Sequence, residues 1–340
     1  MVRVALRQLR NQVAVLGLLV PVVLVVLVST RPSIPAGATD VFDLTTRVQR
    51  DVYQGGLVLL AVLPALVGAF VGAPLVAREL ENGTHLLAWS QSVTRTRWLV
   101  TKIASAAVVV ATATGAMSLA MTRWARALDG ATGARQGSLP SRLTPIAFAM
   151  RGVVPIGYAL FALVVGVLAG VVLRRSLPAM AVTIAVVVGL QIVVPIWVRP
   201  HLVDATSIDA IVDRATFDGI SLRGDGRAPV LLAHTGDHDD WILRQETVDA
   251  AGRPASLPAT FLGCVPDATS APGGGVQQAA PTGKAAFEEC LATLAADGYR
   301  QHLEYLPASI FWTLQWRELA LFLAGTAVLI GASVAAVRRA

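Results

Sequence analysis

Charged residues are scarce in this chain of 340 residues: only 15% are Asp, Glu, Lys or Arg, whereas 54% are hydrophobic and the mean hydropathy is +0.62. This composition excludes an ordinary soluble protein and is typical of a polytopic membrane protein. Metal-ligand residues are also few, with two cysteines and five histidines. Segment 234–240 holds the densest group, but its spacing fits neither a zinc site nor an EF-hand, and it is interpreted as a solvated acidic turn. No metal site is predicted.

The motifs of nucleotide binding and hydrolysis are missing from the sequence. Gly283-Lys284 resembles the end of a phosphate-binding loop, but Gln278 replaces the first glycine and Ala285 follows the lysine, so the pattern G-x-x-x-x-G-K-[ST] fails. The sequence also lacks G-x-S-x-G and H-E-x-x-H motifs. We therefore expect no catalytic residue, no nucleotide site and no cofactor in this chain.

The net charge of +6 does not come from a basic domain. Residues 199–317 contain 9 Lys and Arg against 15 Asp and Glu, a net charge of −6, which leaves +12 on the remainder of the chain. Most of that excess lies at the ends of apolar segments, where cations anchor helices and face anionic head groups. The sequence therefore predicts contact with membrane lipid and no nucleic-acid partner.

Six apolar segments are long enough to cross a bilayer, since roughly 20 apolar residues span about 30 Å of hydrocarbon. They are residues 13–29, 55–76, 103–121, 153–173, 177–198 and 319–337. We expect a mainly α, polytopic membrane protein with six transmembrane helices. Their positive flanks place both termini in the cytoplasm, at a plasma membrane crossed several times. These flanks are Arg3, Arg7, Arg10, Arg174, Arg175, Arg338 and Arg339.

Two features oppose this topology. The connection after the third span is predicted to lie outside and yet contains Arg123, Arg126, Arg135 and Arg142. The first span could also be a cleavable signal peptide, because residues 36–38 read Ala-Gly-Ala, a small-x-small cleavage site. Its apolar run is longer than the usual signal core of roughly 7 to 15 residues, which favours a membrane span.

The interior of the spans contains few polar groups. No acidic or basic residue lies in the middle of a predicted span, where Gln191 is the strongly polar residue. Ion-driven carriers and intramembrane enzymes need ionisable groups at that depth, so energy is expected to come from elsewhere. Two spans contain the G-x-x-x-G spacing that lets helix backbones approach closely, at Gly68/Gly72 and Gly166/Gly170.

An extracytoplasmic α+β domain is predicted between the fifth and sixth spans, at residues 199–317. Residues 229–233 and 241–248 favour strands, and residues 284–297 favour a helix that stops at Gly298. In an oxidising compartment Cys264 and Cys290 would pair, which stabilises the domain by about 3 kcal/mol in the loop-entropy model. The alternative is two reduced, buried thiols. The remainder forms five helices in residues 1–198 and a sixth in residues 318–340.

The loop at residues 77–102, ARELENGTHLLAWSQSVTRTRWLVTK, is unusually rich in polar groups for a connection between two spans. The pair Asn82-Gly83 breaks a first short helix and Thr84 caps a second one. The carboxylates of Glu79 and Glu81 would face an anionic leaflet, which favours a protein partner instead. Arg95, Arg97, Trp98 and Lys102 are expected to anchor the third span at the head groups.

This loop resembles the loop of actinobacterial type-2 ABC transporter permeases, which reads close to ARE-E-GTH-LAWTQSV-R-RWL--K after Gly-Ala-Pro, here residues 72–74. Residues 305–316 resemble the family's entry into its last span, through Tyr-Leu-Pro-Ala-Ser and Phe-Trp-x-x-Gln-Trp. The resemblance implies the permease subunit of an ATP-driven exporter. An ABC ATP-binding subunit would bind ATP and Mg²⁺, and a second permease subunit, identical or different, would complete the pathway.

In that family the loop carries the helix that couples the permease to its ATPase subunit. The resemblance assigns this role to Arg78, Glu79, Glu81, Gly83 and Thr84, and the apolar side of the second short helix adds Leu87 and Trp89. Two other functions stay open from the residues alone. The chain could be a non-transporting membrane anchor that presents residues 199–317 as a sensor or binding domain, or an ion-driven carrier.

Overall fold

The structure is a computed structural model of the chain, and it describes residues 10–32, 46–83, 94–129, 142–213, 216–221, 230–235, 240–262, 264 and 284–339. The chain forms two compact units. The first comprises Met1–Ala134, Thr144–Leu202 and Phe311–Ala340, and the second comprises Arg135–Leu143 and Val203–Ile310. The sequence placed the boundaries of the inserted domain at residues 199 and 317, whereas residues 199–202 and 311–317 belong to the helical unit.

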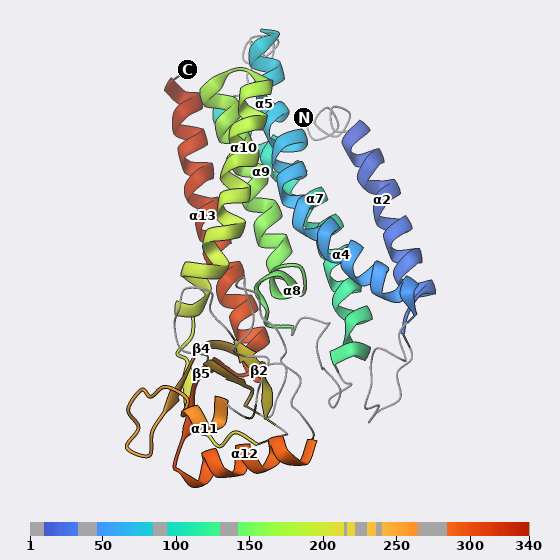
Figure 1. Cartoon of the computed structure of the whole chain (residues 1–340). Coiled ribbons are helices and arrows are strands. Elements are labelled where there is room, and N and C mark those ends of the chain that lie inside the picture. The colour runs from blue at the N-terminus through green and yellow to red at the C-terminus, as the bar shows by residue number, and fades with distance from the viewer. Residues whose placement is uncertain are drawn as a thin grey trace. The chain divides into compact units, whose positions relative to one another are not determined.

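The first unit is built from helices (Figure 1). They are α2 (Arg10–Ser29), α4 (Arg47–Leu66), α5 (Ala73–Glu81), α7 (Arg95–Asp129), α8 (Pro145–Ala149), α9 (Val154–Leu173), α10 (Ser176–Val193) and α13 (Phe311–Arg339). A π-helical turn, η1 (Val67–Gly72), joins α4 to α5. A second π-helical turn, η2 (Val194–Val198), and a 3-10 turn, η3 (Arg199–His201), extend α10.

Within the described residues, five helical stretches are long and apolar enough to cross a membrane. They are Arg47–Glu81, Arg95–Asp129, Val154–Leu173, Ser176–His201 and Ala308–Arg339. The first predicted span corresponds to α2, whose apolar part Gly17–Ser29 is shorter. The mainly helical, multi-pass architecture is therefore present, and the sixth crossing stays a prediction.

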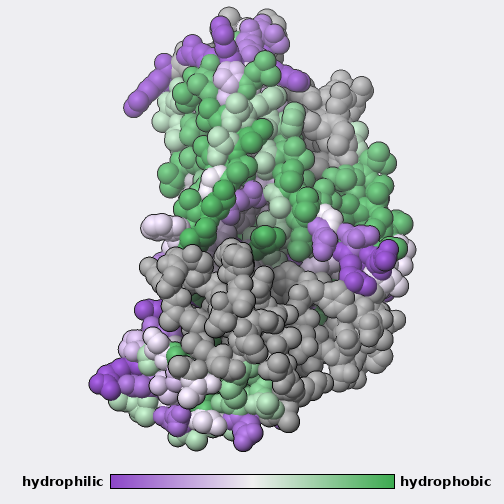
Figure 2. Space-filling view, in the orientation of Figure 1, coloured by the Kyte–Doolittle hydropathy of each residue, from purple (hydrophilic) through white to green (hydrophobic). Residues whose placement is uncertain are grey.

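Helix α9 is the central helix of this unit. It lies among the other helices of the unit (Figure 1) and contacts α4, η1, α5, α7, α10 and α13. Most of its side chains are buried. The outer faces of α10 and α13 instead expose aliphatic side chains such as Ile196 and Val328. Figure 2 shows hydrophobic residues over these helices and hydrophilic residues gathered where α5 and α13 end. An apolar exterior of this kind suits the hydrocarbon of a bilayer.

The second unit contains two small antiparallel sheets. Strands β1 (Thr206–Ala210), β5 (Arg300–Leu306) and β4 (Trp241–Val248) form one sheet in the order β1-β5-β4. Strands β2 (Phe217–Ser221) and β3 (Val230–Ala233) form the other. The described residues of this unit also form a short helix, α11 (Ala259–Leu262), and a longer one, α12 (Lys284–Ala296). The predicted strands at 229–233 and 241–248 and the predicted helix at 284–297 are confirmed, whereas β1, β2 and β5 were not predicted.

Helix α12 packs one apolar stripe into the core of this unit. Phe287, Leu291 and Leu294 are buried in one cluster with Leu231 and Phe261. The helix stops where glycine was expected to stop it, because Gly298 adopts a left-handed conformation with φ of +86°. The spacing of apolar residues therefore determined the buried face of α12, and Gly298 determined its end.

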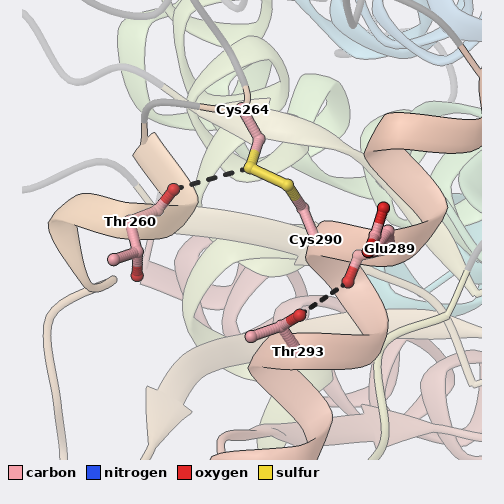
Figure 3. Close-up of a disulfide and its surroundings, with 5 residues drawn as sticks. All are labelled: Thr260, Cys264, Glu289, Cys290 and Thr293. Carbon is pink, nitrogen blue, oxygen red and sulfur yellow. Dashed lines mark hydrogen bonds between the residues drawn. A yellow bond between two sulfur atoms is a disulfide. The ribbon is translucent and has the colours of Figure 1, made fainter.

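The two cysteines form a disulfide that joins α11 to α12 (Figure 3). The Cα atoms of Cys264 and Cys290 lie 6.5 Å apart, and both side chains pack against the apolar core of the second unit. Thr293 donates a hydrogen bond to the carbonyl oxygen of Glu289 beside them, at 2.9 Å. The disulfide therefore ties the short helix α11 to the one long helix among the described residues of this unit.

Candidate functional site

The site begins where α5 ends. The Asn82 N–H donates to the carbonyl oxygen of Arg78 at 3.1 Å, and Gly83 follows with φ of +69°. A positive φ costs glycine little, so the pair Asn82-Gly83 ends the helix as the sequence indicated. Arg78, Glu81 and Asn82 are exposed at this end. Thr84, Leu87 and Trp89, the other residues assigned to coupling, lie outside the described residues.

Glu81 binds the first turn of α10. Its Oε1 accepts the backbone N–H of Ser176 at 2.8 Å, and its Oε2 accepts the Ser176 hydroxyl at 2.7 Å. A carboxylate is favourable there because the first N–H groups of a helix have no partner within it and carry a positive dipole. Glu81 therefore caps α10 from another helix and links α5 to the α9–α10 turn.

Glu79 binds a buried lysine on α7. It forms an ion pair with Lys102, whose ammonium also donates to the carbonyl oxygen of Leu75 at 3.3 Å and lies 4.7 Å from the centre of the Trp98 ring. Lys102 and Trp98 are each only 5% exposed. The expectation that these two residues anchor α7 at the head groups is therefore wrong: burial places them in a contact between α5 and α7.

The C-terminal end of α13 reaches the same end of the helical unit. Arg338 donates from Nε to the Thr96 hydroxyl at 3.2 Å, at the start of α7. Beneath these polar contacts lies one apolar cluster drawn from α5, α7, α9 and α13. Its buried members are Val76, Trp98, Leu99, Ile103, Val164, Val167, Val171 and Val337. The end of α5 therefore shares this cluster with α7, α9 and α13, and Glu81 attaches it to α10. We call this region the α5 end.

The two G-x-x-x-G segments pack against each other within the chain. A Cβ atom on Gly166 of α9 would meet the carbonyl oxygen of Gly68 and lie 2.7 Å from the nitrogen of Ala73. A Cβ atom on Gly170 would lie 2.6 Å from the carbonyl oxygen of Ala73. Real Cβ atoms do not approach backbone atoms so closely, so only glycine permits this contact. The glycines therefore join the α4–η1–α5 helix to α9.

A second polar cluster lies at the opposite end of α10. Arg199 and Glu318 form an ion pair in which both side chains are fully buried, with Nε–Oε2 and Nη2–Oε1 distances of 2.8 and 3.1 Å. The guanidinium also donates to the carbonyl oxygen of Pro145 and lies 4.3 Å from the centre of the Phe148 ring. This pair joins η3, α8 and α13.

Charged side chains at the ends of the predicted spans also serve contacts between helices, as the buried pair shows. The predicted fifth span ended at residue 198, just before Arg199, and the predicted sixth span began at residue 319, just after Glu318. The helical stretches Ser176–His201 and Ala308–Arg339 include both residues. Gln191, the polar residue expected inside a span, donates to the carbonyl oxygen of Ala61 at 2.7 Å and joins α10 to α4. Polar groups inside this unit therefore serve contacts between helices.

Gln315 caps α9 much as Glu81 caps α10. Its Oε1 accepts the N–H groups of Val153 and Val154, both at 2.9 Å, and its Nε2 donates to the carbonyl oxygen of Phe148 at 3.0 Å. The side chain is fully buried. Gln315 belongs to the second segment that resembles the permease family, so that segment has a structural role in fixing the start of α9.

Part of the helical unit is similar to a known protein family. Residues 33–199 match the family described as ABC-2 membrane transporter related. This part of the chain is therefore similar to proteins related to ABC-2 membrane transporters. The matched residues include α4, α5, α7, α8, α9 and α10, and therefore the glycine contact and the α5 end apart from its α13 residues. Neither the curated proteins nor the solved structures gave a match.

The residues that this structure describes contain no group of three or more His, Cys, Asp or Glu arranged to hold a metal ion. The acidic segment 234–240 is described only at its two ends. There the hydroxyl of Thr235 donates to Asp240, and the other carboxylate oxygen of Asp240 accepts the N–H of Ala308 at 2.7 Å. Both interactions are structural contacts of the second unit.

Replacing Gly166 with alanine should destabilise the protein by about 1 to 3 kcal/mol, because the added methyl group forces α9 away from η1 and α5. The apparent melting temperature of the full chain in lipid nanodiscs measures this effect. Gly189→Ala on α10 is the matched control, since a Cβ atom there meets no described atom within 4 Å. Equal melting temperatures for the two variants would contradict the packing.

Proposed function

We propose that this chain is the membrane-spanning subunit of an ATP-driven exporter. A separate ATPase subunit hydrolyses ATP with Mg²⁺, and a second permease subunit, the same chain or a related one, completes the pathway. The family match of residues 33–199 and the five apolar helices of the described residues support a permease. The observation that carries the proposal is the α5 end, where one exposed helix terminus contacts α7, α9 and α10.

The α5 end is proposed to face the cytoplasm. The α9–α10 turn, with Arg174 and Arg175, and the end of α13, with Arg338, contact the same region as α5 and α7. Clustered arginines at one end of the helices favour the cytoplasmic side of the plasma membrane. In this orientation α5 presents its terminus to a soluble ATPase subunit, and residues 199–317 lie outside the cytoplasm.

The docking surface is proposed to be the tip of the loop. We propose that Leu87 and Trp89 supply its apolar contact and that Arg78, Gly83 and Thr84 contribute to the same surface. Glu79 and Glu81 hold the base of the loop, through Lys102 and Ser176 respectively. When the ATPase subunits close on ATP, the bound loop moves with them, and Glu79 and Glu81 move the attached helices.

Co-purification tests this proposal. The tagged chain is expressed with the ATPase encoded next to it, and the complex is purified in nanodiscs. We expect the ATPase to co-purify and to hydrolyse ATP, and we expect Leu87→Asp combined with Trp89→Asp to release it. A matched control places two aspartates at exposed apolar positions of the second unit, Ile208 and Ile211, and should retain the ATPase.

Two results would contradict the proposal. The first is a purified permease without any ATPase subunit. The second is a loop variant that retains the ATPase at the wild-type level, which is the result expected of a non-transporting membrane anchor whose loop has no partner.

A further inference from the structure

We propose that Glu81 is a positioning residue that transmits movement of the docked α5 end to α10, rather than a residue that itself binds the ATPase. This inference rests on the proposed function, because it assumes that an ATPase docks at the loop. It separates two roles that the sequence assigned to one set of residues: the loop tip binds the partner, and Glu81 passes the movement on.

Both oxygens of the Glu81 carboxylate are used within the chain. One accepts the Ser176 N–H and the other accepts the Ser176 hydroxyl, at 2.8 and 2.7 Å. Hydrogen bonds to an ionised acceptor are stronger than those between neutral groups. Ser176 is only 9% exposed, so a second protein has little access to the group that Glu81 binds. The geometry therefore favours an internal role for this carboxylate.

The α9–α10 turn is too short to absorb movement of Glu81. Only Arg174 and Arg175 separate the two helices, and among the described residues Arg174 is the one non-glycine residue with positive φ, at +53°. A side chain in the left-handed region costs roughly 1 kcal/mol or more, and surrounding structure must hold it there. A displacement of Ser176 therefore moves α9 and α10 together.

Two further contacts fix α5 to its neighbouring helices at this end. The carbonyl oxygen of Ala73 lies against Gly170 of α9, and Glu79 is paired with Lys102 of α7. On α7 the link is made by the Lys102 side chain, which binds Glu79 and the Leu75 carbonyl oxygen, whereas on α10 Glu81 binds the backbone N–H of the helix terminus itself. Glu81 is therefore the contact best placed to move α10 when α5 moves.

The test compares Glu81→Ala, Glu81→Gln, Ser176→Ala and the Glu81→Ala/Ser176→Ala double variant in the full complex in nanodiscs. Two quantities are measured: the ATPase retained per permease, and the ATP hydrolysis rate relative to the ATPase alone. We expect Glu81→Ala to retain the ATPase but to lower permease-dependent hydrolysis roughly tenfold, as loss of a charge-assisted hydrogen bond allows. Glu81→Gln keeps an acceptor and a donor for Ser176 and should restore most of the activity.

A second measurement follows the contact without the partner. Trypsin cleaves after Arg174 and after Arg175. The rate at which these two bonds are cut in the permease alone therefore reports opening of the turn. Glu81→Ala should raise that rate roughly tenfold. The double variant should be cut no faster than Glu81→Ala, because Glu81→Ala already removes both hydrogen bonds, including the hydroxyl bond that Ser176→Ala removes. Glu246→Ala, which removes a carboxylate of the second unit that lies 3.6 Å from Arg244, is the control.

The outcomes distinguish the two proposals. If the wild-type permease binds no ATPase, the proposed function fails and Glu81 is left with a structural role alone. If Glu81→Ala and Glu81→Gln both release the ATPase, Glu81 binds the partner directly and the positioning role is wrong. The positioning role is also wrong if the two single changes add in the trypsin measurement.

Discussion

Replacing Glu318 with alanine is expected to destabilise the helical unit by about 3 to 5 kcal/mol, since it leaves a buried guanidinium without its counter-ion. Arg199 and Glu318 are both fully buried, and the guanidinium already contacts the Pro145 carbonyl and the Phe148 ring. Water does not reach this position to solvate the remaining charge. The apparent melting temperature of the permease in nanodiscs should therefore fall by many degrees.

The paired variant Arg199→Met/Glu318→Leu separates two quantities: the free energy lost when Arg199 is left without a counter-ion, and the net stabilisation that the ion pair provides. Replacing both charges by apolar side chains of similar size is often neutral or stabilising, so this variant should melt close to the wild type. Glu246→Ala, a carboxylate change on the second unit, should change little. A Glu318→Ala protein as stable as the wild type would show that Arg199 is solvated rather than buried.

Replacing both cysteines with serine should destabilise the second unit by about 3 kcal/mol, because the disulfide restricts the unfolded chain across a sequence separation of 26 residues. The loss should be concentrated at α11 and α12, which the bond joins. Hydrogen exchange of the full chain measures it as faster exchange in α12 than in the helices of the first unit.

Reduction supplies the matched control for this prediction. A reductant should bring the wild-type exchange of α12 to the level of the Cys264→Ser/Cys290→Ser variant and leave the variant itself unchanged. If reduction alters the wild type and the variant equally, or neither, the cysteines do not hold these helices together.

Local patterns in the sequence predicted much of the fold. Five of the six predicted apolar segments correspond to membrane-length helices of the described residues, because hydropathy over some 20 residues is a property of the segment itself. The same holds for α12, whose stripe of Phe287, Leu291 and Leu294 lies within one helix. Strands β1 and β5 were missed because their pairing joins residues about 100 positions apart: Thr206 lies opposite Tyr305, and neither strand alternates strongly.

The candidate site was predicted in place but not in its contacts. The break at Asn82-Gly83 follows from the backbone freedom of glycine, and the loop was identified by its resemblance to the permease family. The partners of its carboxylates could not be predicted, because Ser176 lies 95 residues from Glu81 and Lys102 belongs to the next helix. A charge next to an apolar segment has the same appearance in the sequence whether lipid or another helix receives it.

The sequence by itself determined that this chain is a helical membrane protein with a polar loop between two apolar segments, because composition and periodicity act over short distances. Only the tertiary structure decided how its polar groups are used. Glu79, Glu81, Glu318 and Gln315 all bind groups on other helices, and Gly166 contacts another helix backbone. The physical reason is that the energy of a buried or partly buried polar group depends on the partner it meets in space.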